Sequence, residues 1–248
     1  MKLTGNTLLI TGGATGIGLG LARAFAARGN RVVICGRRRE KLDQAREAVP
    51  ELRTYRCDVS DADERRVLVR SIENDGLRPN VLINNAACMR PYDLAEPGEL
   101  DTGALGRDIQ INFAAPVEMI QLLLPVLQEQ DGATIINVSS PGGVVPVAKV
   151  PIYCASKAAL HSYTLSLRHQ LADRIEVIEV YPPSVDTEMM NGVQLDKISV
   201  EEYTDGLLPR LAKGETEIWT GDARYLPLMS RLAPRKTFEL VNRTTRFA

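Results

Sequence analysis

The stretch Thr7-Leu8-Leu9-Ile10-Thr11-Gly12-Gly13-Ala14-Thr15-Gly16-Ile17-Gly18, close to the start of the chain, decides the fold. Its first five residues are apolar and β-prone and run into glycine, which is typical of a buried parallel strand. Apolar residues then recur at helical spacing from Leu21 to Ala26, and Gly29 follows as a helix end. Strand, glycine turn and helix together predict an anion-binding turn. Glycines let the backbone approach a pyrophosphate closely, and a helix N-terminus offers free N–H groups.

The glycine spacing of this turn has two interpretations. Gly12, Gly16 and Gly18 differ from the Gly-x-Gly-x-x-Gly of the commonest dinucleotide fingerprint. An ordinary glycine-rich turn that binds nothing is the alternative, and the further features described below argue against it. The candidate contacts for the phosphates of a dinucleotide are Gly12, Thr15, Gly16, Ile17 and Gly18.

A basic cluster follows the second predicted strand, Arg31 to Cys35. Proteins that hold NAD usually place an acidic residue about 20 residues past the glycine turn, where it binds the ribose 2′-OH. Here Gly36 stands at that place, and Arg37, Arg38 and Arg39 follow. A guanidinium can clamp a 2′-phosphate that a carboxylate would repel. The sequence therefore predicts NADP(H) in preference to NAD(H), with Arg37 and then Arg38 as contacts and Arg39 as a solvated helix start.

The rest of the chain alternates β-prone and helical segments without an obvious linker. Further strands are predicted at 52–57, 81–83, 134–138, 175–180 and 217–220, and helices at 61–73 with Ser60 as N-cap, 103–128 with an irregularity at Pro116, 152–172 and 199–212. Such alternation implies parallel strands with right-handed crossovers. We therefore predict one doubly wound α/β domain over 1–248, a seven-stranded, mainly parallel, Rossmann-type sheet with helices on both faces.

Composition excludes several classes of protein. The 248 residues are 44% hydrophobic with a net charge of −1, so one full core is expected and no basic field would attract nucleic acid. Four cysteines without a Cys-x-x-Cys pattern indicate a reduced cytoplasmic protein, and we expect no signal peptide. No apolar run approaches the ~20 residues of a membrane span, and the two histidines give no metal-ligand pattern.

Tyr153 and Lys157 form a Tyr-x-x-x-Lys pair, and Ser140 precedes them. Four residues are just over one helical turn, so the two side chains share a helix face. A phenol has an ordinary pKa of about 10, and a neighbouring ammonium would lower it toward neutral pH. The pair therefore predicts an acid/base tyrosine, with Ser140 as a second hydroxyl for the oxygen of a substrate.

With these motifs the chain resembles the short-chain dehydrogenase/reductase superfamily over roughly residues 5–190. The resemblance rests on Thr11-Gly12-x-x-x-Gly16-Ile17-Gly18, Asp58-Val59, Asn84-Asn85-Ala86, Asn112, Ser140, Tyr153-x-x-x-Lys157 and the turn ending in Thr187. It implies that Asn112 distorts its helix to hold a relay water and that Lys157 also holds the nicotinamide ribose. It further implies cofactor contacts from Asp58, Val59, Asn84, Ala86, Pro182, Val185 and Thr187.

The resemblance implies an NADP(H)-dependent oxidoreductase that acts on a carbonyl/alcohol pair, and a homodimer or homotetramer. An epimerase that recycles a bound nicotinamide on the same residues is one alternative. A dinucleotide-sensing protein without catalysis is another, although it would not need Asn112, Ser140, Tyr153 and Lys157. The chain departs from the family pattern at Ala87 and at Pro183, where the family usually has glycine. Alanine fits at position 87 if the backbone there keeps a negative φ, and Pro183 stiffens the entry to the substrate loop.

The substrate pocket is expected from the loops at 88–93, 141–150 and 185–198, the last of which belongs to a substrate loop spanning about 185–212. Met89, Tyr92, Val144, Val145, Val147, Met189 and Met190 would give these loops an apolar lining suited to a hydrophobic carbonyl compound or alcohol. Alternatively, these apolar side chains simply cover the core. Arg90 and Lys149 could bind a carboxylate of the substrate, and solvated surface charges are the alternative for them. The C-terminal segment 223–248 carries six basic residues against one acidic residue, which favours a packed helix or subunit contact over a membrane-surface element.

Overall fold

A computed structural model describes residues 1–92 and 101–247, and its centre is a seven-stranded parallel sheet. The strand order is β3-β2-β1-β4-β5-β6-β8, and every neighbouring pair is parallel. The strands are β1 (Thr7–Thr11), β2 (Arg31–Gly36), β3 (Arg53–Arg56), β4 (Val81–Asn84), β5 (Thr134–Val138), β6 (Glu176–Tyr181) and β8 (Glu217–Trp219). The predicted doubly wound sheet is confirmed, and its order reverses between β1 and β4.

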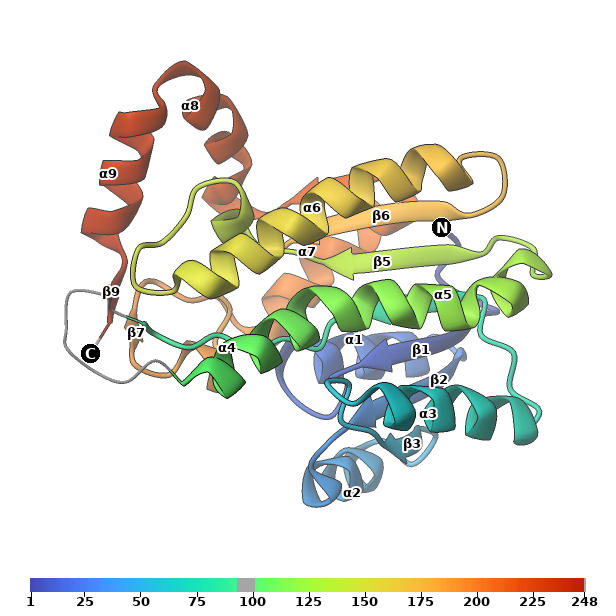
Figure 1. The fold of residues 1–248 in the computed structure, drawn as a ribbon. Helices are drawn as coiled ribbons and strands as arrows, with labels where there is room; N and C mark the ends of the chain where they lie inside the picture. Colours follow the sequence, from blue (N-terminus) through green and yellow to red (C-terminus); the bar gives the residue numbers. More distant parts are fainter. Residues whose placement is uncertain (93–100, 248) are drawn as a thin grey trace.

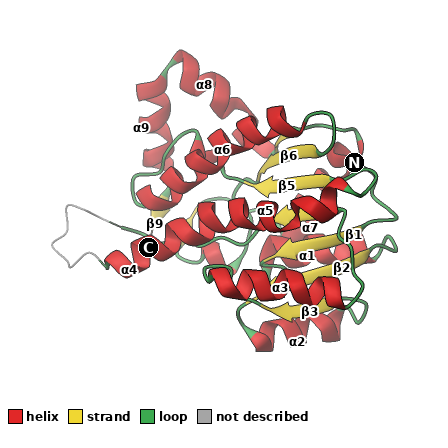
Figure 2. Ribbon diagram, turned by 45° about the vertical axis from the view of Figure 1, so that its right-hand side comes forward, coloured by secondary structure: helices red, strands yellow, loops and turns green. Residues whose placement is uncertain are grey.

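Helices cover both faces of the sheet (Figures 1 and 2). The helices α1 (Gly16–Ala26), α2 (Arg39–Ala48) and α7 (Val200–Ala212) cover one face, where Phe25, Leu42 and Leu207 join the core. The helices α3 (Ala62–Asn74), α5 (Ala115–Gln128) and α6 (Pro151–Leu171) cover the other. Fully buried Leu9, Ile10, Leu82 and Ile83 alternate between the two cores, as strands buried on both faces require.

The predicted helix over 103–128 is divided into three pieces. After α4 (Thr102–Ile109) comes a π-helical turn, Gln110–Ala114, and then α5. The irregularity therefore lies around Asn112, while Pro116 sits in the first turn of α5, which tolerates proline. A second correction concerns α3, whose N-cap is Asp61: its carboxylate accepts hydrogen bonds from the N–H groups of Asp63 and Glu64, whereas Ser60 hydrogen-bonds Asp58.

The tract Thr102–Gln128 has the length and mean hydropathy, 1.4, of a membrane span, contrary to the sequence expectation that no such run exists. Met119, Leu123 and Leu127 are nevertheless fully buried in the core beside α3. This side of the tract packs as a helix of the domain core does.

The C-terminal segment forms a helical hairpin beyond the sheet. It comprises α8 (Leu226–Leu232) and α9 (Pro234–Thr244), which project from the body at the upper left of Figure 1. A final strand, β9 (Arg246–Phe247), pairs with β7 (Val193–Gln194) of the substrate loop. This two-stranded sheet has no signal in the sequence, because two-residue strands have no periodicity to detect.

Candidate active site

One large cleft of about 1920 Å³ opens at the carboxyl ends of the strands. Ligands of doubly wound folds bind at this edge, where the strand order reverses. The predicted residues Gly12, Thr15, Gly16, Ile17, Arg37, Arg38, Asp58, Val59, Ala86, Ser140, Tyr153, Lys157, Pro182, Val185 and Thr187 line it. Gly18, Asn84 and Asn112 do not line it and lie behind its wall.

The glycine turn after β1 is shaped for a ligand that approaches the backbone. Gly12 has φ +64°, and a Cβ there would lie 2.9 Å from the Cα of Ala86. A Cβ at Gly18 would meet the carbonyl oxygen of Gly12 and lie 2.5 Å from Asn85 Nδ2. This close backbone and the N-terminus of α1 fit the pyrophosphate of a dinucleotide.

Asn85 holds this turn against β4, a role that its place in a motif did not reveal. Its Nδ2 donates to the carbonyl oxygens of Thr11 (2.9 Å) and Gly12 (3.1 Å). The Thr11 hydroxyl accepts hydrogen bonds from the backbone N–H groups of Asn85 and Ala86. No described non-glycine residue has positive φ, so Ala87 has the negative φ that an alanine needs at this place.

Asn84 and Asn112 support the cleft from below. Asn84 Nδ2 donates to Asn137 Oδ1 (2.9 Å), while its buried Oδ1 has no hydrogen-bond partner among the described residues. The Asn112 side chain accepts from the N–H of Cys88 and donates to its carbonyl oxygen, both at 2.9 Å. Asn112 thus clamps the loop after β4 to the π-helical turn.

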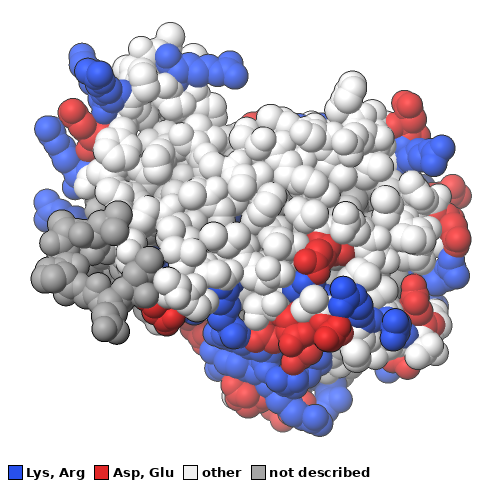
Figure 3. All heavy atoms as spheres, in the orientation of Figure 1, with Lys and Arg blue, Asp and Glu red and all other residues white. Residues whose placement is uncertain are grey.

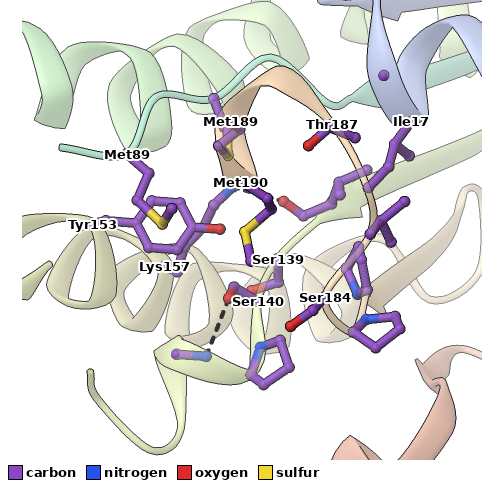
Figure 4. A pocket seen from close by; sticks show the side chains of 18 of the residues that line it. Ile17, Met89, Ser139, Ser140, Tyr153, Lys157, Ser184, Thr187, Met189 and Met190 are labelled. Carbon is purple, nitrogen blue, oxygen red and sulfur yellow. Dashed lines mark hydrogen bonds between the residues drawn. The ribbon is translucent and has the colours of Figure 1, made fainter. Parts of the chain in front are cut away.

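Ser140, Tyr153 and Lys157 converge at the centre of the cleft. In Figure 4 the Tyr153 hydroxyl points into the cleft beside Met190, with Lys157 behind the ring. Ser140 Oγ accepts from the N–H of Gly142 at 3.1 Å. The buried Lys157 Nζ lies 5.8 Å from the Tyr153 ring centroid and donates to the carbonyl oxygen of Val138 at 2.7 Å.

The acidities of this pair differ from the sequence expectation. Burial raises the pKa of Tyr153 to about 12, although its hydrogen bond with Ser140 acts to lower it. Burial lowers the pKa of Lys157 to about 8. The expected lowering of the phenol pKa by the ammonium is not found, because desolvation disfavours the charged form of each group.

The adenosine end of the cleft carries interactions that the sequence did not predict. The Asp58 carboxylate accepts from the Ser60 hydroxyl (2.7 Å) and forms an ion pair with Arg107 of α4. Burial acts to raise the pKa of Asp58, but the Ser60 hydrogen bonds and the Arg107 and Arg37 charges outweigh it and hold that pKa below its ordinary value.

Arg38 and Lys41 flank the carboxylate of Glu188. Arg38 Nη2 lies 2.8 Å from Glu188 Oε2, and Lys41 Nζ lies 3.9 Å from Oε1. Neither Lys41 nor Glu188 has a sequence signal, because Glu188 meets Arg38, 150 residues away in the chain, and its neighbour Lys41.

The lining of the substrate end is mainly apolar, as predicted, but comes from more of the chain than expected. Met89, Val145, Val147, Met189 and Met190 line it, whereas Tyr92, Val144 and Lys149 do not, and Asp93 lies outside the described residues. Further lining comes from α7, β8 and the C-terminal segment: Tyr203, Trp219, Tyr225, Leu226, Met229, Leu240 and Phe247. Arg90 is paired with the buried Asp108 at 3.3 Å. Within residues 1–92 and 101–247, no group of three or more His, Cys, Asp or Glu side chains could hold a metal ion.

Comparison with known proteins decides the family. The family model described as short chain dehydrogenase matches residues 6–197. The chain belongs to this family. It is 40% identical over 249 residues to an uncharacterized oxidoreductase, DltE, of Bacillus subtilis, with 98% of both chains covered. It is 29% identical over 248 residues to a fatty acyl-CoA reductase of Acinetobacter baylyi, covering 94% of this chain and 82% of that protein.

A solved structure supports the same assignment. A short-chain dehydrogenase from Burkholderia cenocepacia, in complex with NADP, superposes with a TM-score of 0.83 at 28% identity and covers 98% of this chain and 99% of the other. The resemblance inferred from the motifs is confirmed. The protein is an oxidoreductase of the short-chain dehydrogenase family, whose members bind a nicotinamide dinucleotide.

Proposed function

We propose that this dehydrogenase transfers a hydride between NADP(H) and a mainly hydrophobic carbonyl compound or secondary alcohol. The observation that carries the proposal is the meeting of Ser140, Tyr153 and Lys157 at the carboxyl edge of the sheet, in the same cleft as the glycine turn. The bound dinucleotide supplies or accepts the hydride. The residues of the chain provide position and protonation.

In this proposal Tyr153 donates a proton to the substrate oxygen during reduction and removes it during oxidation. Ser140 hydrogen-bonds the same oxygen, where negative charge develops. Lys157, with a pKa near 8, can gain and lose a proton close to neutral pH, which suits it to restore the proton of Tyr153. Asn112 positions the loop after β4 and, as in the family pattern, holds a water that would continue the relay.

The preference for NADP(H) is supported by three cationic side chains and by the lack of an acidic residue at the end of β2. Arg37, Arg38 and Lys41 line the cleft near Asp58, and Gly36 leaves no acid at the end of β2. Comparing kcat/KM for NADPH and NADH tests the preference, with Arg37→Ala and Arg38→Ala expected to reduce the NADPH value selectively. A higher kcat/KM with NADH in the unchanged protein would overturn it.

A hydrophobic substrate is supported by the apolar lining of the outer cleft. We expect aliphatic or aromatic ketones, aldehydes and secondary alcohols to react with higher kcat/KM than polyhydroxylated compounds of equal size. A panel of matched pairs, followed through the absorbance of the reduced nicotinamide, tests this. Conversion of a substrate without any net change in that absorbance would indicate the alternative, an epimerase.

A homodimer or homotetramer is supported by the outer face of α5 and α6. Figure 3 shows this face nearly free of charged side chains, whereas acidic and basic groups gather over α2 and α3. Leu165 of α6 is 45% exposed, and Phe113 and Tyr163 form an edge-to-face pair between the π-helical turn and α6. We expect Leu165→Glu to yield monomers in light scattering, with Leu232→Glu on α8 as the control that separates this face from the C-terminal hairpin. Monomers from the control alone would assign the interface to the hairpin.

A reducing, cytoplasmic location remains part of the proposal, supported by four cysteines that are all free thiols.

A further inference from the structure

Glu188 forms ion pairs with two of the cations that a 2′-phosphate would need. It begins the short 3₁₀ helix Glu188–Met190, directly after Thr187. Its two carboxylate oxygens face two cations from the other side of the cleft, Arg38 at 2.8 Å and Lys41 at 3.9 Å. The Arg38 guanidinium is the first cause that holds the pKa of Glu188 below its ordinary value, so the group is a full anion at neutral pH.

A carboxylate between an arginine and a lysine resembles a phosphate group in charge and in hydrogen-bond geometry. Phosphate monoesters carry about −1.5 to −2 charges at neutral pH, so a phosphate bound by Arg38 would also be repelled by Glu188. The 2′-hydroxyl of NADH carries no charge and meets no such repulsion. Glu188 should therefore oppose the binding of one cofactor and not of the other.

We propose that Glu188 is a specificity-determining residue that competes with the 2′-phosphate of NADP(H) for Arg38 and Lys41. Binding of NADP(H) exchanges the Glu188 ion pairs for phosphate ion pairs, and Glu188 sets the affinity for NADP(H) below the value that the cations alone would give. This inference rests on the proposed NADP(H) site.

The same exchange reaches the substrate end of the cleft. Met189 and Met190 follow Glu188 in the same 3₁₀ helix, and both line the cleft near Tyr153 (Figure 4). The exchange would remove two ion pairs of the segment that carries these side chains, while Lys197 Nζ still donates to the carbonyl oxygen of Met190 at 2.7 Å.

The expected effect is moderate because the ion pair is partly solvated. The side chains of Arg38 and Glu188 are 40% and 54% exposed, and exposed pairs are weakened by water and salt. We expect Glu188→Gln to lower the Kd of NADPH about 3- to 10-fold and to change the Kd of NADH less than about twofold. The gain should shrink at about 0.5 M salt.

Isothermal titration calorimetry of the full chain with NADPH and NADH tests this without an assay of activity. Glu202→Gln is the matched control, since Glu202 is an exposed glutamate that lines the same cleft from the first turn of α7. Adding Glu188→Gln to Arg38→Ala should change the Kd of NADPH less than about twofold, because the main partner is already absent.

An unchanged Kd for NADPH in Glu188→Gln would overturn the inference. An equal gain in Glu202→Gln, or an equal gain for NADH, would also overturn it, because either result would show a general effect of charge. Tighter binding of NADH than of NADPH by the unchanged protein would contradict the proposed cofactor instead, and the response of NADPH binding to Glu188→Gln would still decide this inference.

Discussion

The two ends of the cleft are built in different ways. At the cofactor end, backbone groups at the tips of β1 and β4 meet so closely that Gly12 and Gly18 have no room for a Cβ, and Asn85 ties the two loops together. At the substrate end, long side chains such as Met89, Met189 and Met229 come from segments far apart in the chain. The contrast indicates an inflexible site for a constant cofactor and an adaptable wall for a variable substrate, since methionine repacks easily.

The strongest test separates chemistry from cofactor binding. Tyr153→Phe should reduce kcat by about 100-fold or more, the scale of a lost general acid. The Kd of NADPH should change less than about twofold, because the cofactor end keeps its glycine turn. Turnover assays and calorimetry on the same preparation measure both quantities. Unchanged kcat would remove Tyr153 from the mechanism.

The buried charge of Lys157 should leave a signature in stability. Its pKa of about 8 in the folded protein is below the ordinary 10.5, so the unfolded chain binds more protons between these values and stability rises with pH across that window. The full cost of the buried charge, on the order of 3 kcal/mol, is present below pH 8. Lys157→Met abolishes this rise, so the unfolding free energy of the variant relative to the unchanged protein should fall between about pH 8 and 10.5.

Urea unfolding at several pH values measures this difference, and Lys2→Met, at an exposed lysine, is the control. A difference that stays constant with pH would show that Lys157 keeps an ordinary pKa in the folded protein.

The close packing of the glycine turn gives a smaller effect. Gly18→Ala places a methyl group on the Gly12 carbonyl, so we expect a loss of about 1–3 kcal/mol in stability and weaker NADPH binding. Gly206→Ala is the matched control: this glycine lies exposed inside α7 with no atom within 4 Å of an added Cβ, and the change should stabilise by about 0.5–1 kcal/mol. Equal effects of the two changes would contradict the contrast between the two ends.

The smallest expected effect concerns the adaptable wall. Met190→Ala removes apolar surface beside Tyr153 and should raise KM for hydrophobic substrates by about 3- to 10-fold, which corresponds to roughly 1 kcal/mol. NADPH affinity should stay within about twofold. A loss of NADPH affinity that matches the change in KM would show that the two ends are one coupled unit.

Much of the fold and of the cofactor end could be predicted from the sequence, because the signals are local. Alternating apolar segments predict the parallel sheet, the glycines after Thr11 predict the turn, and the spacing of Tyr153 and Lys157 puts both on one helix face. The visible proline signal predicts an irregularity at Pro116, whereas the π-helical turn lies around Asn112, where only the family resemblance implied a distortion.

Residues close together in the chain encode the order of strands and helices, the family and the candidate acid/base pair. Three features depend on the tertiary structure: burial raises the pKa of Tyr153, Glu188 meets Arg38, and the C-terminal hairpin lines the substrate end. Desolvation and long-range ion pairs depend on which segments pack together, and no spacing along one chain encodes that packing.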